Sequence, residues 1–90
     1  MMWEEFSFVM ASSYRIKILL SLKEGPKTPT EIARETKLHK GNISKVLGQL
    51  REKDLVECIT PTRRKARFYK LTKKGEYVAD KIKMRLTSDN

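Results

Sequence analysis

The first helical pattern in the chain runs over residues 12–22. Its apolar residues recur at intervals of three or four, as they do on the buried face of a helix. Ser12 or Ser13 can cap the start of this segment, and the Gly25-Pro26 pair ends it. We therefore expect a helix here. An apolar stripe in residues 3–10 predicts either a separate short helix or an extension of this one.

A second helix is expected directly after the first. Thr28-Pro29-Thr30-Glu31 provides a capping Thr, a Pro at the first helical position and a Glu where a capping box needs it. A short helix should follow this start signal.

A third helix should begin near His39 or Lys40 and run to about Lys53, because its apolar residues fall at i, i+3, i+4 and i+7. These apolar residues are Ile43, Val46, Leu47 and Leu50. The opposite face carries Gly41, Lys45, Gly48 and Glu52, flanked by Asn42, Ser44 and Gln49. Since this outward face is small and polar, it can lie close to another molecule.

The last third of the chain predicts a hairpin and a final helix. Residues 55–60 and 67–71 are rich in β-branched and aromatic side chains, and the basic stretch between them lacks apolar periodicity. Thr72 can cap a helix whose apolar residues repeat at i, i+4 and i+8. The fold class is therefore mainly α with a small β-hairpin, in the order helix, helix, helix, hairpin, helix. Residues 1–90 are expected to form a single domain.

The charge of the chain favours a polyanionic partner. Its 90 residues include 20 Lys and Arg against 11 Asp and Glu, a formal net charge of +9 at pH 7. Such an excess attracts nucleic acid or an anionic membrane surface. No stretch reaches the roughly 18 apolar residues that span a bilayer, and Glu4 and Glu5 stand where a signal peptide carries cations. We therefore expect a cytoplasmic protein that binds nucleic acid and no membrane.

Metal and enzyme chemistry have little support in the sequence. One cysteine, Cys58, and one histidine, His39, leave no disulfide and no cluster of soft ligands, so no metal or other cofactor is expected. Without a phosphate-binding glycine loop or a paired nucleophile and base, no catalytic residue stands out, and we expect no enzyme. Cys58 is interpreted as a small buried hydrophobe, and His39 as a helix cap or a phosphate contact.

The second and third helices, joined by a tight turn, form a helix-turn-helix arrangement, and the basic hairpin after them adds a wing. Between Glu57 and Glu76 the chain has no acidic residue. The cations in this interval are Arg63, Arg64, Lys65, Arg67, Lys70, Lys73 and Lys74. Such a run can neutralise phosphates or enter a minor groove, although charges at a hairpin tip also protect exposed strands from aggregation.

Four segments carry a resemblance to a known family. They are Thr28-Pro29-Thr30-Glu31-Ile32-Ala33, residues 38–50, Lys53-Asp54-Leu55-Val56-Glu57 and Tyr69-Lys70-Leu71-Thr72-Lys73-Lys74-Gly75. Over roughly residues 12–80 the chain closely resembles the winged helix-turn-helix regulators of the ArsR and MarR type, especially small archaeal members. It departs from the metal-sensing members, which carry cysteine or histidine clusters. It is also shorter than many effector-binding members, and the sequence identifies no small-molecule effector.

The resemblance implies that the start and outer face of the third helix read base edges of double-stranded DNA. The residues concerned are Lys40, Gly41, Asn42, Ser44, Lys45 and Gln49. The wing residues would hold the DNA backbone or probe the minor groove, and they are Arg63, Arg64, Lys65 and Arg67. The alternative for the helix residues is an ordinary solvated face. A glycine inside a helix costs about 1 kcal/mol relative to alanine, so Gly41 and Gly48 indicate either close approach to DNA or lax surface positions.

We expect a sequence-specific transcriptional regulator that acts as a homodimer. A chain this short buries little surface, so the helices in residues 3–22 and 72–87 are expected to form the dimer interface. The apolar stripes of these helices are Trp3, Phe6, Met10, Val78, Ile82 and Leu86, which can instead complete the core of a monomer. Two other functions stay open: a nonspecific architectural or chromatin DNA-binding protein, and a winged helix that binds proteins of the transcription, replication or RNA-processing machinery.

Overall fold

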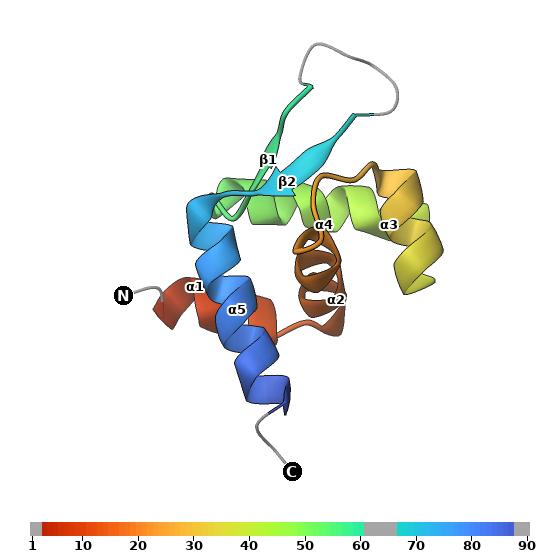
Figure 1. Ribbon diagram of the computed structural model, residues 1–90. Helices are drawn as coiled ribbons and strands as arrows, with labels where there is room; N and C mark the ends of the chain where they lie inside the picture. The colour runs from red at the N-terminus through yellow and green to blue at the C-terminus, as the bar shows by residue number, and fades with distance from the viewer. Residues whose placement is uncertain (1–2, 61–66, 88–90) are drawn as a thin grey trace.

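The computed structural model describes residues 3–60 and 67–87, which form five helices and a two-stranded antiparallel sheet (Figure 1). In chain order the elements are α1 (Trp3–Met10), α2 (Ser13–Leu22), α3 (Pro29–Thr36), α4 (Lys40–Glu52), β1 (Val56–Cys58), β2 (Tyr69–Leu71) and α5 (Lys73–Thr87). The predicted fold class is confirmed. The segment before α2 is a separate helix, because Ser12 leaves the helical conformation and caps α2.

Side-chain caps also set where the three later helices begin. Thr28 and Glu31 form the predicted capping box: the Thr28 Oγ1 accepts from the Glu31 N–H at 3.2 Å, and the Glu31 carboxylate accepts from the Thr28 N–H at 2.9 Å. The His39 Nδ1 accepts from the Gly41 N–H at 3.1 Å, which starts α4. The Thr72 hydroxyl caps α5 in the same way. These caps satisfy backbone donors that a helix start leaves without a partner.

The helices enclose one hydrophobic core to which every helix contributes. Its fully buried side chains include Val9 of α1, Ile18 of α2, Ile32 of α3, Leu47 of α4 and Ile82 of α5. Figure 1 shows α1 and α5 together at one side of the molecule and α3 at the other, with α2 between them. Helix α2 therefore packs against both α3 and α4, the two helices of the helix-turn-helix.

The wing is anchored by a third chain segment that the sequence pattern did not predict. β1 and β2 pair in the register Val56 with Leu71 and Cys58 with Tyr69. On the other side of Tyr69, the backbone of Lys27 exchanges two hydrogen bonds with it, at 3.0 and 2.9 Å. The segment between α2 and α3 therefore pairs with β2, which joins this strand to the start of the helix-turn-helix.

Gly75 brings the start of α5 against the turn that leads into β1. A Cβ added at Gly75 would lie 1.9 Å from the Leu55 carbonyl oxygen, far inside van der Waals contact. Since no side chain fits there, Gly75 is required by the packing of α5 on this turn. In Figure 1 the hairpin projects beyond the helices on the side away from the C-terminal end of α5.

Candidate nucleic-acid interface

Helix α4 divides into a buried and an exposed face as the sequence predicted. Its four buried side chains are Ile43, Val46, Leu47 and Leu50. We call the exposed side the outer face of α4, and it consists of Lys40, Gly41, Asn42, Ser44, Lys45, Gly48, Arg51 and Glu52. A polar helix face with three cations and one carboxylate suits a polyanionic surface.

Neither glycine of the outer face is required by the fold. A Cβ at Gly48 would have no neighbour within 4 Å, and a Cβ at Gly41 would meet only the His39 ring, at 3.3 Å. Gly48 thus has room for a side chain that the sequence does not supply, whereas a side chain at Gly41 would require the capping His39 ring to shift. The middle of the outer face therefore has no side chain that projects from Gly48, so another molecule can approach the α4 backbone there.

Gln49, one of the predicted base-reading residues, lies at the edge of α4 and is half-buried. Its side-chain oxygen accepts a hydrogen bond from Nε of Arg15, at 3.2 Å. Arg15 also donates from Nη1 to the Phe8 carbonyl at 2.8 Å, and its guanidinium lies 3.8 Å from the centre of the Phe8 ring. Arg15 thus occupies one lone pair of the Gln49 oxygen, and the amide NH₂ of Gln49, which has no hydrogen-bond partner in the described part of the chain, can donate to a base.

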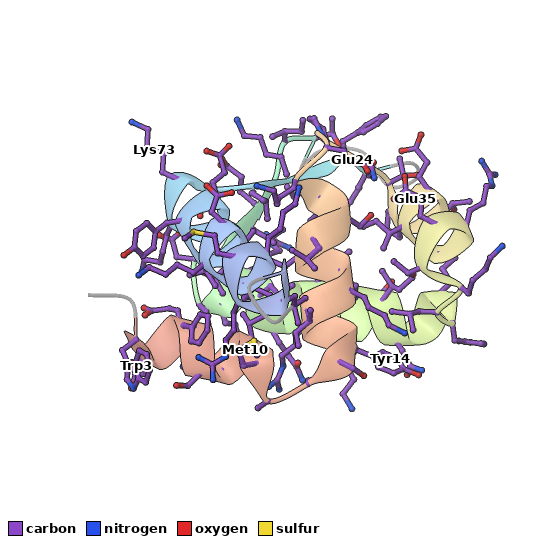
Figure 2. All side chains as sticks on the ribbon, turned by 60° about the horizontal axis from the view of Figure 1, so that its bottom comes forward. Trp3, Met10, Tyr14, Glu24, Glu35 and Lys73 are labelled. Carbon is purple, nitrogen blue, oxygen red and sulfur yellow. The ribbon has the colours of Figure 1, made fainter. Side chains whose placement is uncertain are left out.

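Three of the predicted helix residues come together on one flank of α4. Asn42, Lys45 and Gln49 line a shallow, open hollow of about 260 Å³ between α4 and the start of α2. The other lining residues are Ser12, Tyr14, Arg15 and Val46. Figure 2 shows Tyr14 projecting from the start of α2 beside α4. No pattern in the sequence predicts this neighbourhood, because it depends on the angle at which α2 crosses α4.

The predicted wing residues are only partly within the described chain. Arg63, Arg64 and Lys65 lie outside the described residues. Arg67 is described, is half-buried and has an interaction partner. The strands β1 and β2 lead directly into this basic segment.

Two cations of the basic run are paired with acidic residues that are distant in sequence. Nζ of Lys70 lies 3.8 Å from a carboxylate oxygen of Glu57 on the facing strand, and Nζ of Lys74 lies 3.5 Å from one of Glu5 on α1. A backbone hydrogen bond at Glu5, together with Lys74, lowers the pKa of Glu5 below its usual value. The positive charge of this run is therefore partly compensated along β2 and at the start of α5.

A cluster of polar side chains beneath the wing centres on Lys27. Its Nζ lies 2.6 Å from both carboxylate oxygens of Glu35 on α3, 2.8 Å from Glu24 and 3.2 Å from the Ser21 hydroxyl. Burial opposes the charged form, but the hydrogen bonds to Glu24 and Glu35 outweigh it and raise the pKa of Lys27. The hydrogen bonds that Lys27 and Ser21 donate lower the pKa of Glu35. One residue thus links α2, α3 and, through its backbone, β2.

Other chemistry has little basis in residues 3–60 and 67–87. Within these residues no three His, Cys, Asp or Glu side chains gather to hold a metal ion. None of the described helices has the length and apolar character needed to cross a bilayer. Cys58 is a free, half-buried thiol on β1.

The fold of the chain matches that of MarR-family winged-helix regulators. A mutant of ZitR from Lactococcus lactis is 26% identical over 86% of this chain and 53% of its own, with a TM-score of 0.77. Wild-type ZitR solved in complex with DNA is 24% identical over the same shares, with a TM-score of 0.75. The reduced form of MarR from E. coli is 23% identical over 96% of this chain and 65% of its own, with a TM-score of 0.80. The chain spans about half the length of ZitR.

These solved structures are transcription regulators and not enzymes, and they confirm the predicted resemblance. A comparison with curated protein sequences gave no match. The family model described as the HVO_A0261 N-terminal domain matches residues 3–88, nearly the whole length. The chain therefore belongs to the HVO_A0261 N-terminal domain family, and its fold is that of the MarR-type winged-helix regulators.

Proposed function

We propose that this protein is a sequence-specific regulator of transcription that binds double-stranded DNA as a homodimer. The observation that carries the proposal is the outer face of α4. It is polar and net positive, and it carries no side chain at Gly41 and Gly48, although the fold leaves room for one at Gly48. ZitR, which has this fold, was solved in complex with DNA. A helix of this kind fits the major groove.

In this proposal the residues of α4 have the base-reading role that is expected of them from the sequence. The residues that meet base edges in the major groove are Lys40, Gly41, Asn42, Ser44, Lys45 and Gln49, of which Gln49 is held in place by Arg15. The wing residues Arg63, Arg64, Lys65 and Arg67 neutralise phosphates or enter the minor groove. The backbone pairing of Lys27 with Tyr69 supports this, because it joins β2, the strand after the basic segment, to the segment between α2 and α3.

The homodimer is proposed to form through α1 and α5. Three apolar or aromatic side chains of these helices are more than half exposed: Trp3 by 70%, Met84 by 68% and Leu86 by 54%. Trp3 stacks on Phe6 at a ring-centroid distance of 5.8 Å, and Figure 2 shows Trp3 projecting from the free end of α1. Burying such side chains against a second copy stabilises a dimer.

Two residues of the apolar stripes expected to form the dimer interface do not belong to this dimer surface. Val78 and Ile82 are fully buried in the core of the chain. The interface is therefore proposed on the neighbouring exposed positions of α5 instead. In the dimer, the two α4 helices enter successive major grooves about 34–36 Å apart. Because the dimer has two-fold symmetry, its DNA site should be a palindrome of two half-sites. DNA as the partner favours a cytoplasmic location.

Selection of bound fragments from random duplex DNA at physiological salt tests the function. We expect enrichment of one palindromic motif, with a salt-dependent affinity, because phosphate contacts release counterions. A nonspecific architectural protein would bind without enriching a motif. A chain that retains no duplex even at low ionic strength would indicate the remaining alternative, a winged helix that binds other proteins.

A further inference from the structure

The hollow between α2 and α4 has an unusual charge balance. Its seven lining residues are Ser12, Tyr14, Arg15, Asn42, Lys45, Val46 and Gln49. They include two cations, Arg15 and Lys45, and no carboxylate. An open depression lined in this way attracts an anion.

Three donors at the hollow have no partner within residues 3–60 and 67–87. These are the Tyr14 hydroxyl, the Asn42 amide and the Lys45 ammonium, for which the described structure gives no side-chain hydrogen bond or ion pair. In contrast, Lys23 is paired with Asp80, and Lys27 with Glu24 and Glu35. The positive charge at the hollow is therefore not compensated by nearby acids.

The donors that do have partners keep the hollow in shape. Arg15 donates to Gln49 from Nε and to Phe8 from Nη1, so its guanidinium is fixed against α1 and α4. The Ser12 hydroxyl accepts from the Arg15 N–H at 3.4 Å and caps α2. Tyr14 and Lys45 thus border a depression with a fixed wall.

We propose that this hollow binds a backbone phosphate of the DNA strand that borders the major groove in which α4 lies. The proposal rests on the proposed function and assigns Tyr14 and Arg15 of α2 to the DNA interface. It also reassigns Lys45 from the base edges to the DNA backbone. A helix with its side chains is about 10–12 Å wide, and the major groove is about 12 Å wide. The sugar-phosphate strands therefore run along the flanks of an inserted helix, where Asn42 and Lys45 meet Tyr14.

The shape of the hollow favours a strand over a small enclosed ligand. It is shallow and open, so it can receive the edge of a polymer that continues in both directions. Tyr14 donates its hydroxyl hydrogen to a phosphate oxygen, and Lys45 contributes its charge. This contact fixes how far α4 enters the groove, because α2 and α4 then hold the same strand.

A tyrosine pair in the chain provides a matched test. Tyr14→Phe removes only the hydroxyl at the hollow, and Tyr77→Phe removes the hydroxyl of a comparably exposed tyrosine on α5, 45% against 36%. We expect Tyr14→Phe to weaken duplex binding about tenfold, as loss of a hydrogen bond to a charged group does, and equally for the selected motif and for random duplex. Tyr77→Phe should leave the affinity unchanged.

Lys45→Gln gives an independent readout. For each copy of the chain bound, it should lower the slope of log affinity against log salt by about 1. Its loss of affinity should also be uniform across sequences. A loss confined to the selected motif, with the salt slope unchanged, would make Lys45 a base-reading residue and overturn the proposal.

Inorganic phosphate distinguishes a DNA strand from a free oxyanion. NMR titration of the free protein should show weak binding of phosphate at Tyr14 and Lys45, and duplex DNA should displace it. If phosphate binds there but Tyr14→Phe leaves duplex affinity unchanged, the hollow takes small oxyanions and the backbone assignment is wrong. If Tyr14→Phe equals Tyr77→Phe in every assay, the hollow takes no anion. Failure of the wild-type protein to bind any duplex would instead contradict the proposed function itself.

Discussion

Gly48 makes α4 less stable than alanine would, at a position where the fold has room for a side chain. The sequence showed this cost, and the structure adds that nothing in the described chain lies within 4 Å of an added Cβ. Gly75 is the opposite case, since the Leu55 carbonyl oxygen occupies the place of its Cβ. Sequence alone could not separate these two glycines, because the difference depends on which segment packs against each.

Gly48→Ala should stabilise the protein and weaken DNA binding. Alanine in place of an exposed helical glycine contributes about 0.5–1 kcal/mol to the free energy of unfolding. The added methyl group would reduce the close approach of α4 to a duplex. Thermal unfolding and duplex titration measure the two effects. Gly75→Ala is the contrasting control, expected to lower stability, and unchanged DNA affinity in Gly48→Ala would count against contact at the middle of the outer face.

Asn42→Ala and Gln49→Ala should change base preference more than overall affinity. Each good base contact contributes about 1–3 kcal/mol of discrimination at its own position in the site. Repeating the fragment selection with each variant measures the preference. Uniform loss across all sequences would reject both residues as base readers. For Gln49 that result would point to its bond with Arg15 as its main role.

At the scale of elements, the sequence predicted most of what local rules determine. The start of α3 at its capping box and the bounds of α4 followed from residue types at fixed spacing. The pairing of Lys27 with Tyr69 did not, because it joins segments far apart in the chain. The hollow at Tyr14 and the link from Arg15 to Gln49 were missed for the same reason. Candidate residues could be chosen from the sequence, but their neighbours could not.

The Lys27 cluster should make stability depend on acid pH through Glu35. The folded pKa of Glu35 lies below its ordinary value of 4.5, so its contribution is fully present above that pH and is lost as the pH falls through the folded pKa. Glu35→Gln should therefore flatten the pH dependence of thermal unfolding below about 4.5. The matched control is Glu52→Gln on the outer face of α4. An identical pH profile for Glu35→Gln and the wild type would exclude this role.

Lys27→Met tests whether the same cluster positions the wing. It keeps the backbone pairing with Tyr69 but removes the ammonium that binds Glu35. Loss of such hydrogen bonds at a largely buried ammonium should lower stability by about 1–2 kcal/mol. At temperatures where the variant is folded, DNA affinity should also fall, because Glu35 of α3 is no longer bound to the segment that pairs with β2. Lower stability with full DNA affinity would limit Lys27 to a structural role.

At the scale of the whole molecule, two surfaces on different helices have separate tasks. The outer face of α4 and the hollow form the proposed DNA interface, whereas α1 and α5 expose apolar side chains. A dimer through the first and last helices, as expected from the sequence, therefore stays a proposal. Its surface includes fewer residues than the sequence predicts. Val78 and Ile82 complete the core of the single chain.

Replacing Trp3 and Leu86 with Ser should separate assembly from folding. Both side chains are more than half exposed, so their loss should leave the core intact. Analytical ultracentrifugation at micromolar concentration is expected to show a dimer for the wild type and a monomer for the double variant. The monomer should bind palindromic DNA more weakly because the two half-sites are no longer joined. A wild-type monomer under these conditions would remove the dimer from the account.

The most direct test of the central claim is NMR chemical-shift mapping of the isotopically labelled protein with its selected duplex. We predict that the largest changes fall on the outer face of α4, on Tyr14 and on the basic wing, with α5 beyond Tyr77 unaffected. Changes concentrated on α1 and α5, with α4 unperturbed, would contradict the assignment of α4 and the wing as the DNA-binding surface.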